Sequence, residues 1–342
     1  MKILEDWGTK KIQIFYKYLQ KNPTKFTSAT ELFKSKKLIY FSAIAFMIGF
    51  VLTIPIIYIE LKFDIFNIDD MNMENILFYV FIFTVLVFFE FYLLFLLGFH
   101  MIAYYIYNFY HINNRVMSDV TEKEFLGMLS RTIMELPEKS EEKYNIGHHK
   151  NQNVDLIAIG ILYKLKVVVS NLLLKLLARR VLARTAFRLY TPYIAAVGTG
   201  VWDAIIFYKT IKHSQYKIMV RYTILLLLDR KKDELMKSEN VKAILLRYHH
   251  YSEYNNNFDF LLSEIHKETS FNYEKESFLE EDVRSKCNQK LLLLLYSFKE
   301  KMHTKEENEK VRGIWDSDLL KEIRTALKNG DTAYLESFIE GM

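Results

Sequence analysis

Two long apolar runs near the amino terminus constrain the fold of this chain more than any other feature. Residues 38–59 are 22 consecutive residues without a charge. A helix of that length reaches about 33 Å, enough to cross the hydrocarbon core of a bilayer. Residues 76–103 form a second run, interrupted only by Glu90 and His100. We expect a pair of membrane-spanning helices; two buried helices of a soluble protein are the alternative.

Composition excludes a disordered chain and a mostly membrane-embedded one. Of 342 residues, 51% are hydrophobic and 15% aromatic, more than a disordered chain carries in water. A further 25% are charged, too many for a chain that lies mainly in lipid. With one cysteine and four prolines, we expect no disulfide framework and long uninterrupted helices. No strand-like alternation stands out, so we predict an all-α membrane protein.

Positive charge is concentrated before the first run. Residues 1–37 carry nine lysines against three acids, whereas the connection between the runs carries Lys62 with five acids. Lysines near spans stay on the cytoplasmic side, so we expect both termini in the cytoplasm. The first run is too long for a signal peptide. Four tyrosines that follow the second run are typical of an interfacial belt: Tyr104, Tyr105, Tyr107 and Tyr110.

Changes in charge divide the chain into five expected parts. These are a basic cytoplasmic segment, a transmembrane helical hairpin, a helix with a charged linker, a basic apolar helical core against the membrane, and an acidic soluble helical domain: 1–37, 38–110, 111–153, 154–228 and 229–342. Thr121 and Glu124 have the spacing of a capping box, which predicts a helix start. Near the carboxyl end, Asn329-Gly330 predicts a helix stop and Asp331 the cap of a last helix.

The core combines apolar and basic residues. Residues 160–228 carry eleven Lys and Arg against Asp203 alone. Residues 154–187 predict one or two long helices, and the first half of this stretch is apolar on nearly all sides, which favours a helix buried in a bundle or lying at the interface over a third span. A stripe of three arginines shares one helical face. With a lysine further on, we expect it to bind anionic lipid headgroups, with a solvated face or nucleic acid as alternatives: Arg180, Arg184, Arg188 and Lys209.

Small residues open the apolar stretch after Pro192. Ala196 and Gly200 are four residues apart, a spacing that predicts close helix packing. A re-entrant membrane hairpin formed by 190–208 and 216–228 is the alternative. Asp203 is the single acid in this stretch, and we expect a basic partner from the arginine stripe.

Other polar residues suggest chemistry only weakly. Glu90 lies in the middle of the second run, which indicates either a proton or cation site or an interhelical hydrogen bond to a second Glu90 or a tyrosine. His249, His250 and Glu253 are weak candidate metal ligands, because no further ligand accompanies them. No catalytic motif is present, so we expect no enzyme and no cofactor.

Parts of the chain resemble a known group of sequences. The residues FFEFYLL at 88–94, YKLKVVVSNLLLKLLARRVLAR at 163–184 and Trp202-Asp203-Ala204 resemble a family of uncharacterised bacterial two-span inner-membrane proteins. The portion from Arg179-Arg180 to Trp202-Asp203-Ala204 is also similar to EcsC-type membrane-associated domains. The chain has Asp203 where the family pattern has Asn. The resemblance covers residues 76–228 and implies a bacterial inner membrane, with no known activity.

These patterns favour a membrane-anchored scaffold or interaction module. Its expected partners are anionic lipids and a protein, or a second copy of the chain, and not nucleic acid. An oligomeric channel or ion-coupled protein using Glu90 is the second hypothesis. A metal-dependent enzyme that acts on lipid is the third.

Overall fold

The all-α prediction is confirmed in the residues that the computed structural model describes. These are 2–21, 26–62, 73–113, 119–134, 191–235, 290, 293–294, 297–298 and 317–342. Within them lie eight helices and no strand: α1 (Lys2–Leu19), α2 (Ala29–Phe33), α3 (Lys37–Lys62), α4 (Met73–Ile112), α5 (Asp119–Ile133), α7 (Thr191–Leu235), α12 (Ser317–Asn329) and α13 (Thr332–Glu340).

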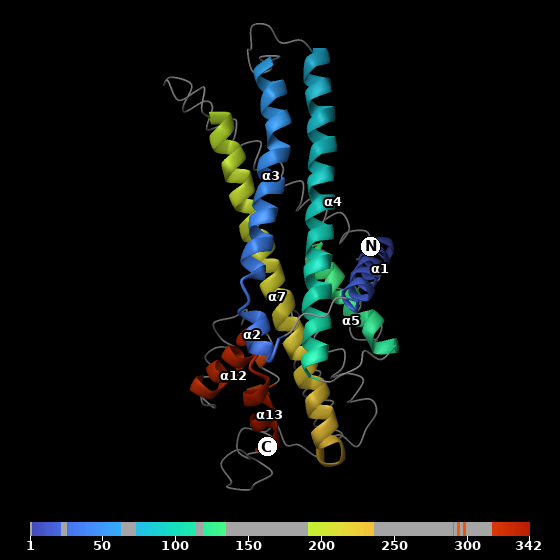
Figure 1. Ribbon diagram of the computed structural model, residues 1–342, viewed down its shortest axis with the longest axis vertical. Coiled ribbons are helices and arrows are strands. Elements are labelled where there is room, and N and C mark those ends of the chain that lie inside the picture. Colours follow the sequence, from blue (N-terminus) through green and yellow to red (C-terminus); the bar gives the residue numbers. More distant parts are fainter. Residues whose placement is uncertain are drawn as a thin grey trace, which may run out of the picture.

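Helices α3 and α4 stand side by side, and α7 runs along α3 for much of its length (Figure 1). Both are long and apolar enough to cross a membrane, over Ala29–Ile59 and Phe81–Ile112. In the most apolar 18-residue stretch of α4, only 6% is buried inside the protein. Bulky side chains such as Phe81 and Phe88 are exposed there. A core helix of a soluble protein would bury such a face, so its exposure favours contact with lipid.

The lower part of α4 has the opposite character. Phe99 and residues 101–110 are buried, and His100 is half-buried, because α1, α2, α5 and α7 pack around this end of the helix. The expected tyrosine belt is therefore wrong. All four tyrosines lie inside the helical bundle, where Tyr105 meets Phe33 edge-on at 5.9 Å and Tyr107 meets Tyr16 at 5.6 Å between ring centroids.

Helix α7 contacts five of the other helices: α3, α4, α5, α12 and α13. It is continuous over 45 residues and runs from beside α3 to the lower end of the bundle (Figure 1). Because no turn separates 208 from 216, the re-entrant hairpin formed by 190–208 and 216–228 is wrong. The boundary expected between 228 and 229 also falls inside this helix.

The lower half of α7 buries some of the cations that the sequence placed against a membrane. Lys217 and Arg221 are buried. The Nζ atom of Lys217 donates to Thr132 Oγ1 at 3.3 Å, and the guanidinium of Arg221 lies 5.9 Å from the ring centre of Phe125. These two bases of the 160–228 segment therefore face α5 rather than lipid.

Helices α1 and α5 cover the opposite side of α4 (Figure 1). The amino-terminal segment is thus part of the bundle. A buried ion pair joins the two helices, with Arg131 Nη1 3.0 Å from Glu5 Oε2. The helix predicted from Thr121 and Glu124 is present, but it begins earlier, at Asp119.

The last two helices pack against the lower part of α7. The predicted stop is confirmed: α12 ends at Asn329, and Gly330 has a positive φ of 71°, which glycine adopts without steric cost. Asp331 caps α13 as predicted, accepting a hydrogen bond from the backbone N–H of Tyr334 at 3.1 Å. Thr30 Oγ1 donates to the Gly330 carbonyl at 3.1 Å, which ties α2 to this end of the chain.

Candidate functional site

Lysines gather where the two apolar helices enter the bundle. Among the described side chains of residues 3–37, five lysines are exposed and two are half-buried: Lys10, Lys17, Lys21, Lys34 and Lys36, then Lys11 and Lys37. We call these seven the amino-terminal lysines. In the same residues, Glu5 is buried against Arg131, Asp6 is half-buried, and Glu31 is exposed. The accessible charge of this region is therefore strongly positive.

A pocket of about 560 Å³ opens among the end of α1, the start of α3 and the middle of α4. We call it the foot pocket. Eight residues line it: Tyr18, Leu19, Lys36, Lys37, Tyr40, Phe41, His100 and Tyr104. It therefore combines two lysines and a histidine with aromatic rings, and none of these lining residues is an acid.

Aromatic contacts fix the walls of the foot pocket. The Nζ atom of Lys37 lies 4.0 Å from the centre of the Tyr104 ring, in a cation–π contact. The ring of Phe41 stacks on His100 at 5.7 Å, and Phe15 meets the same imidazole edge-on at 5.1 Å. These contacts hold the Lys37 ammonium and the His100 ring in place before any ligand arrives.

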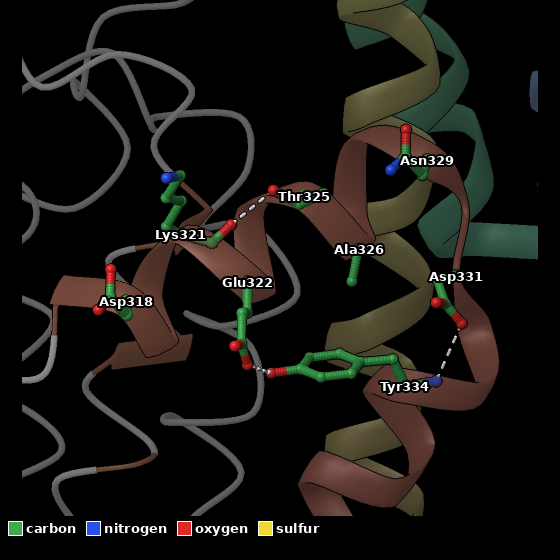
Figure 2. Close-up of a pocket in the computed structure, with 8 residues that line it drawn as sticks. All are labelled: Asp318, Lys321, Glu322, Thr325, Ala326, Asn329, Asp331 and Tyr334. Atoms are coloured by element: carbon green, nitrogen blue, oxygen red, sulfur yellow. Dashed lines mark hydrogen bonds between the residues drawn. The ribbon is translucent and has the colours of Figure 1, made fainter.

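A second pocket, of about 470 Å³, lies between α12 and α13 and has the opposite charge (Figure 2). Asp318, Glu322 and Asp331 line it with a single cation, Lys321. Its polar groups make hydrogen bonds that stabilise the two helices: Tyr334 Oη donates to Glu322 Oε2 at 3.1 Å, and Asp331 caps α13. Burial, with the hydrogen bond to Glu322, raises the pKa of Tyr334 to about 12. We assign it a structural role.

Two carboxyl groups meet between α4 and α7. The side chains of Glu90 on α4 and Asp203 on α7 share a hydrogen bond. Carboxylate oxygens only accept, so this bond requires a proton on one of the two groups. A Cβ atom at Gly49 would lie 2.0 Å from Asp203 Oδ2, so α3 makes room for the pair with a glycine. The described partner of Asp203 is thus an acid, whereas the sequence suggested an arginine.

The small residues of α7 lie at its contact with α3. Ala196 is buried, and a Cβ atom at Gly200 would lie 2.7 Å from the carbonyl oxygen of Phe46. The two backbones therefore approach as closely as the spacing of these residues predicts.

Several expected site residues cannot be placed. Arg180, Arg184 and Arg188 lie outside the described residues, as do His249, His250 and Glu253. Lys209 is described and is exposed on α7, one turn from Lys212, whose Nζ donates to the Phe33 carbonyl at 3.3 Å. The described part of the chain holds no group of three or more His, Cys, Asp or Glu suited to a metal ion.

The foot pocket is not predicted from the sequence. There, Lys36 and Lys37 indicate only the orientation of the first span, and His100 is an interruption of the second apolar run. The available signal was a pair of cations directly before an apolar run that begins with aromatic residues. That signal does not say which part of another helix will face the lysines.

Comparison with known proteins adds no family to these observations. No protein-family model matches the chain, and no curated protein or solved structure matches it. The function is therefore inferred from the geometry of the chain itself.

Proposed function

We propose that this protein is a membrane-anchored helical module that binds anionic lipid headgroups at the cytoplasmic surface. In this proposal α3 and α4 cross the membrane with the first part of α7 packed along α3, and both termini lie in the cytoplasm with α1, α5, α12, α13 and the rest of α7. The observation that carries it is the set of amino-terminal lysines at the point where the exposed apolar helices enter the bundle.

Charge and position support this proposal together. Cations near an anionic leaflet each contribute about 1 kcal/mol of binding, and the five exposed lysines have one exposed acid, Glu31, among the described residues of the same segment. The apolar faces of α3 and α4 begin directly above them, with Ile39 and Tyr40 each 66% exposed. Lipid would cover those side chains and bring phosphates within reach of the lysines.

The broader role that we propose is that of a scaffold. Lys209 on α7 adds an exposed cation, and the sequence adds Arg180, Arg184 and Arg188. We propose a protein or a second copy of the chain as the partner of the acidic carboxyl-terminal part. The resemblance to two-span inner-membrane proteins supports a bacterial cytoplasmic membrane as the location.

Electron paramagnetic resonance with spin-labelled lipids tests the proposal on the full chain in bilayers. We expect the protein to immobilise labelled phosphatidylglycerol in preference to labelled phosphatidylcholine at low salt, and to lose that preference in 1 M salt because ions screen exposed charges. Replacing Arg180, Arg184 and Arg188 with glutamine should reduce the preference in part. Equal immobilisation of both lipids at low salt would contradict the proposed function.

An ion-coupled protein is a second candidate, favoured by the hydrogen bond between Glu90 and Asp203. A carboxyl pair inside membrane helices is expensive and marks proton relays in transport proteins. Since the partner of Glu90 lies in the same chain, the pair does not need the oligomer axis that the sequence suggested.

Proton flux into liposomes tests this second candidate. If the pair carries protons, full-chain liposomes loaded with a pH-sensitive dye should acidify under an imposed gradient, and Glu90→Gln should reduce the flux to that of empty liposomes. The matched control is Glu74→Gln at the exposed start of the same helix, which should leave the flux unchanged. Wild-type flux equal to that of empty liposomes would remove this candidate.

A further inference from the structure

We propose that the foot pocket binds the phosphate-bearing headgroup of a single anionic phospholipid, with Lys36 and Lys37 as the groups that contact the phosphate. This inference rests on the proposed function, because it assumes that the pocket lies at the level of lipid headgroups. It goes further by naming one site, its residues and the chemistry of its ligand.

The charge of the pocket selects an anion. Lys36, Lys37 and His100 line it without an acidic residue among its eight lining side chains. The pocket between α12 and α13 shows the contrast, because three acids surround its one lysine and no cation is left for an added anion. Ammonium groups without a carboxylate partner are the usual ligands of a phosphate when they lie in a concave site.

The position of the pocket selects a lipid over a soluble phosphate. The pocket lies at the start of α3, and on α4 at the half-buried His100, where partly exposed apolar side chains give way to the buried stretch 101–110. Tyr40 lines the pocket and is exposed, and Met47, Val51 and Ile54 continue an exposed apolar face along α3. An acyl chain attached to a phosphate in the pocket can lie along that face.

The size and rigidity of the pocket suit one headgroup. Its volume of about 560 Å³ falls in the range of small-molecule sites. The Tyr104 ring holds the Lys37 ammonium at 4.0 Å, and Phe41 and Phe15 hold His100 between them. These side chains therefore lose little conformational entropy when a headgroup binds. That favours saturable binding at one site over non-specific electrostatic attraction to the surface.

Binding of a short-chain lipid to the full chain in uncharged maltoside micelles tests the site. The probe is dioctanoyl phosphatidylglycerol, titrated by calorimetry, with dioctanoyl phosphatidylcholine as the neutral comparison. We expect saturable binding of one phosphatidylglycerol per chain. The Lys36→Gln/Lys37→Gln variant should bind about 30-fold more weakly, from the loss of two cations at the site. Lys36→Arg/Lys37→Arg should restore binding, which excludes misfolding as the cause.

The matched control is Lys10→Gln/Lys17→Gln, which removes two exposed amino-terminal lysines outside the pocket. It should weaken binding about threefold or less, because solvent screens exposed charges. Equal weakening by both double variants would overturn the pocket while leaving the proposed function in place. Displacement of the lipid by inorganic phosphate at the same concentration would also overturn it, since the site would then serve a free anion. The proposed function is tested separately by the spin-label experiment in bilayers, where equal immobilisation of phosphatidylglycerol and phosphatidylcholine would contradict it.

Discussion

Replacing Gly200 with leucine is expected to force α7 away from α3 and to lower the free energy of unfolding by about 3 kcal/mol, the upper part of the range for overpacked contacts. Even the Cβ atom would lie 2.7 Å from the carbonyl oxygen of Phe46 and 2.9 Å from its ring. The obstacle includes backbone, which cannot rotate aside as a side chain does. Separating the helices would also move Asp203 away from Glu90.

Gly198→Leu is the matched control for this prediction. It lies two residues away on the same helix, and a Cβ atom there meets nothing within 4 Å. Because leucine favours a helix more than glycine does, this change should stabilise the protein slightly, by about 0.5–1 kcal/mol. Denaturant unfolding in detergent micelles, followed by circular dichroism, measures both. Equal stability of the two variants would show that α3 and α7 do not pack through Gly200.

Removing the charge of Arg131 is expected to have the second large effect. Arg131→Met leaves the buried carboxylate of Glu5 without its ion-pair partner at 3.0 Å. An uncompensated buried charge typically costs about 3–5 kcal/mol of stability. The same change would loosen α1 from α5 at the point where the amino-terminal segment joins the bundle.

An exposed ion pair in the same chain provides the control. Arg230 pairs with Glu340, and their side chains are 41% and 53% exposed. Arg230→Met should change the free energy of unfolding by about 1 kcal/mol or less, because solvent screens such pairs. The double variant Glu5→Gln/Arg131→Met should recover part of the loss. A loss of the same size for Arg131→Met and Arg230→Met would contradict the burial of the first pair.

The second prediction also bears on the proposed function. If α1 detaches, Tyr18 and Leu19 no longer close one side of the foot pocket. Arg131→Met should then weaken phosphatidylglycerol binding in micelles although Arg131 does not line the pocket. Stability and binding would fall together. Lys36→Gln/Lys37→Gln should lower binding and cost only about 1 kcal/mol of stability, because Lys36 is exposed and Lys37 loses a single cation–π contact.

The expected helical hairpin shows what local sequence can predict. The absence of charge over 38–59 and the near absence over 76–103 are properties of consecutive residues. They predict two long helices, as found in α3 and α4, because length and hydropathy alone decide whether a helix can cross a bilayer. The stop at Gly330 and the cap at Asp331 are equally local, since they depend on the φ of one residue and a bond three residues away.

The tyrosines that follow the second run show where local sequence fails. Tyr104, Tyr105, Tyr107 and Tyr110 have the composition of an interfacial belt, yet other helices bury them. An amphipathic ring suits a membrane surface and a protein interior equally well. The choice depends on whether α1, α2 and α7 cover that part of α4, which the residues around the tyrosines do not encode.

The sequence by itself determined the helical class, the two apolar runs and the excess of lysine before the first of them, because each is set by composition over neighbouring residues. Only the tertiary structure decided that Glu90 meets Asp203, that Glu5 is paired with Arg131, and that Lys36 and Lys37 share a pocket with His100. In each case the partners lie on different helices. Helical periodicity in the sequence predicts which face of a helix is buried, but it does not predict which other helix packs against that face.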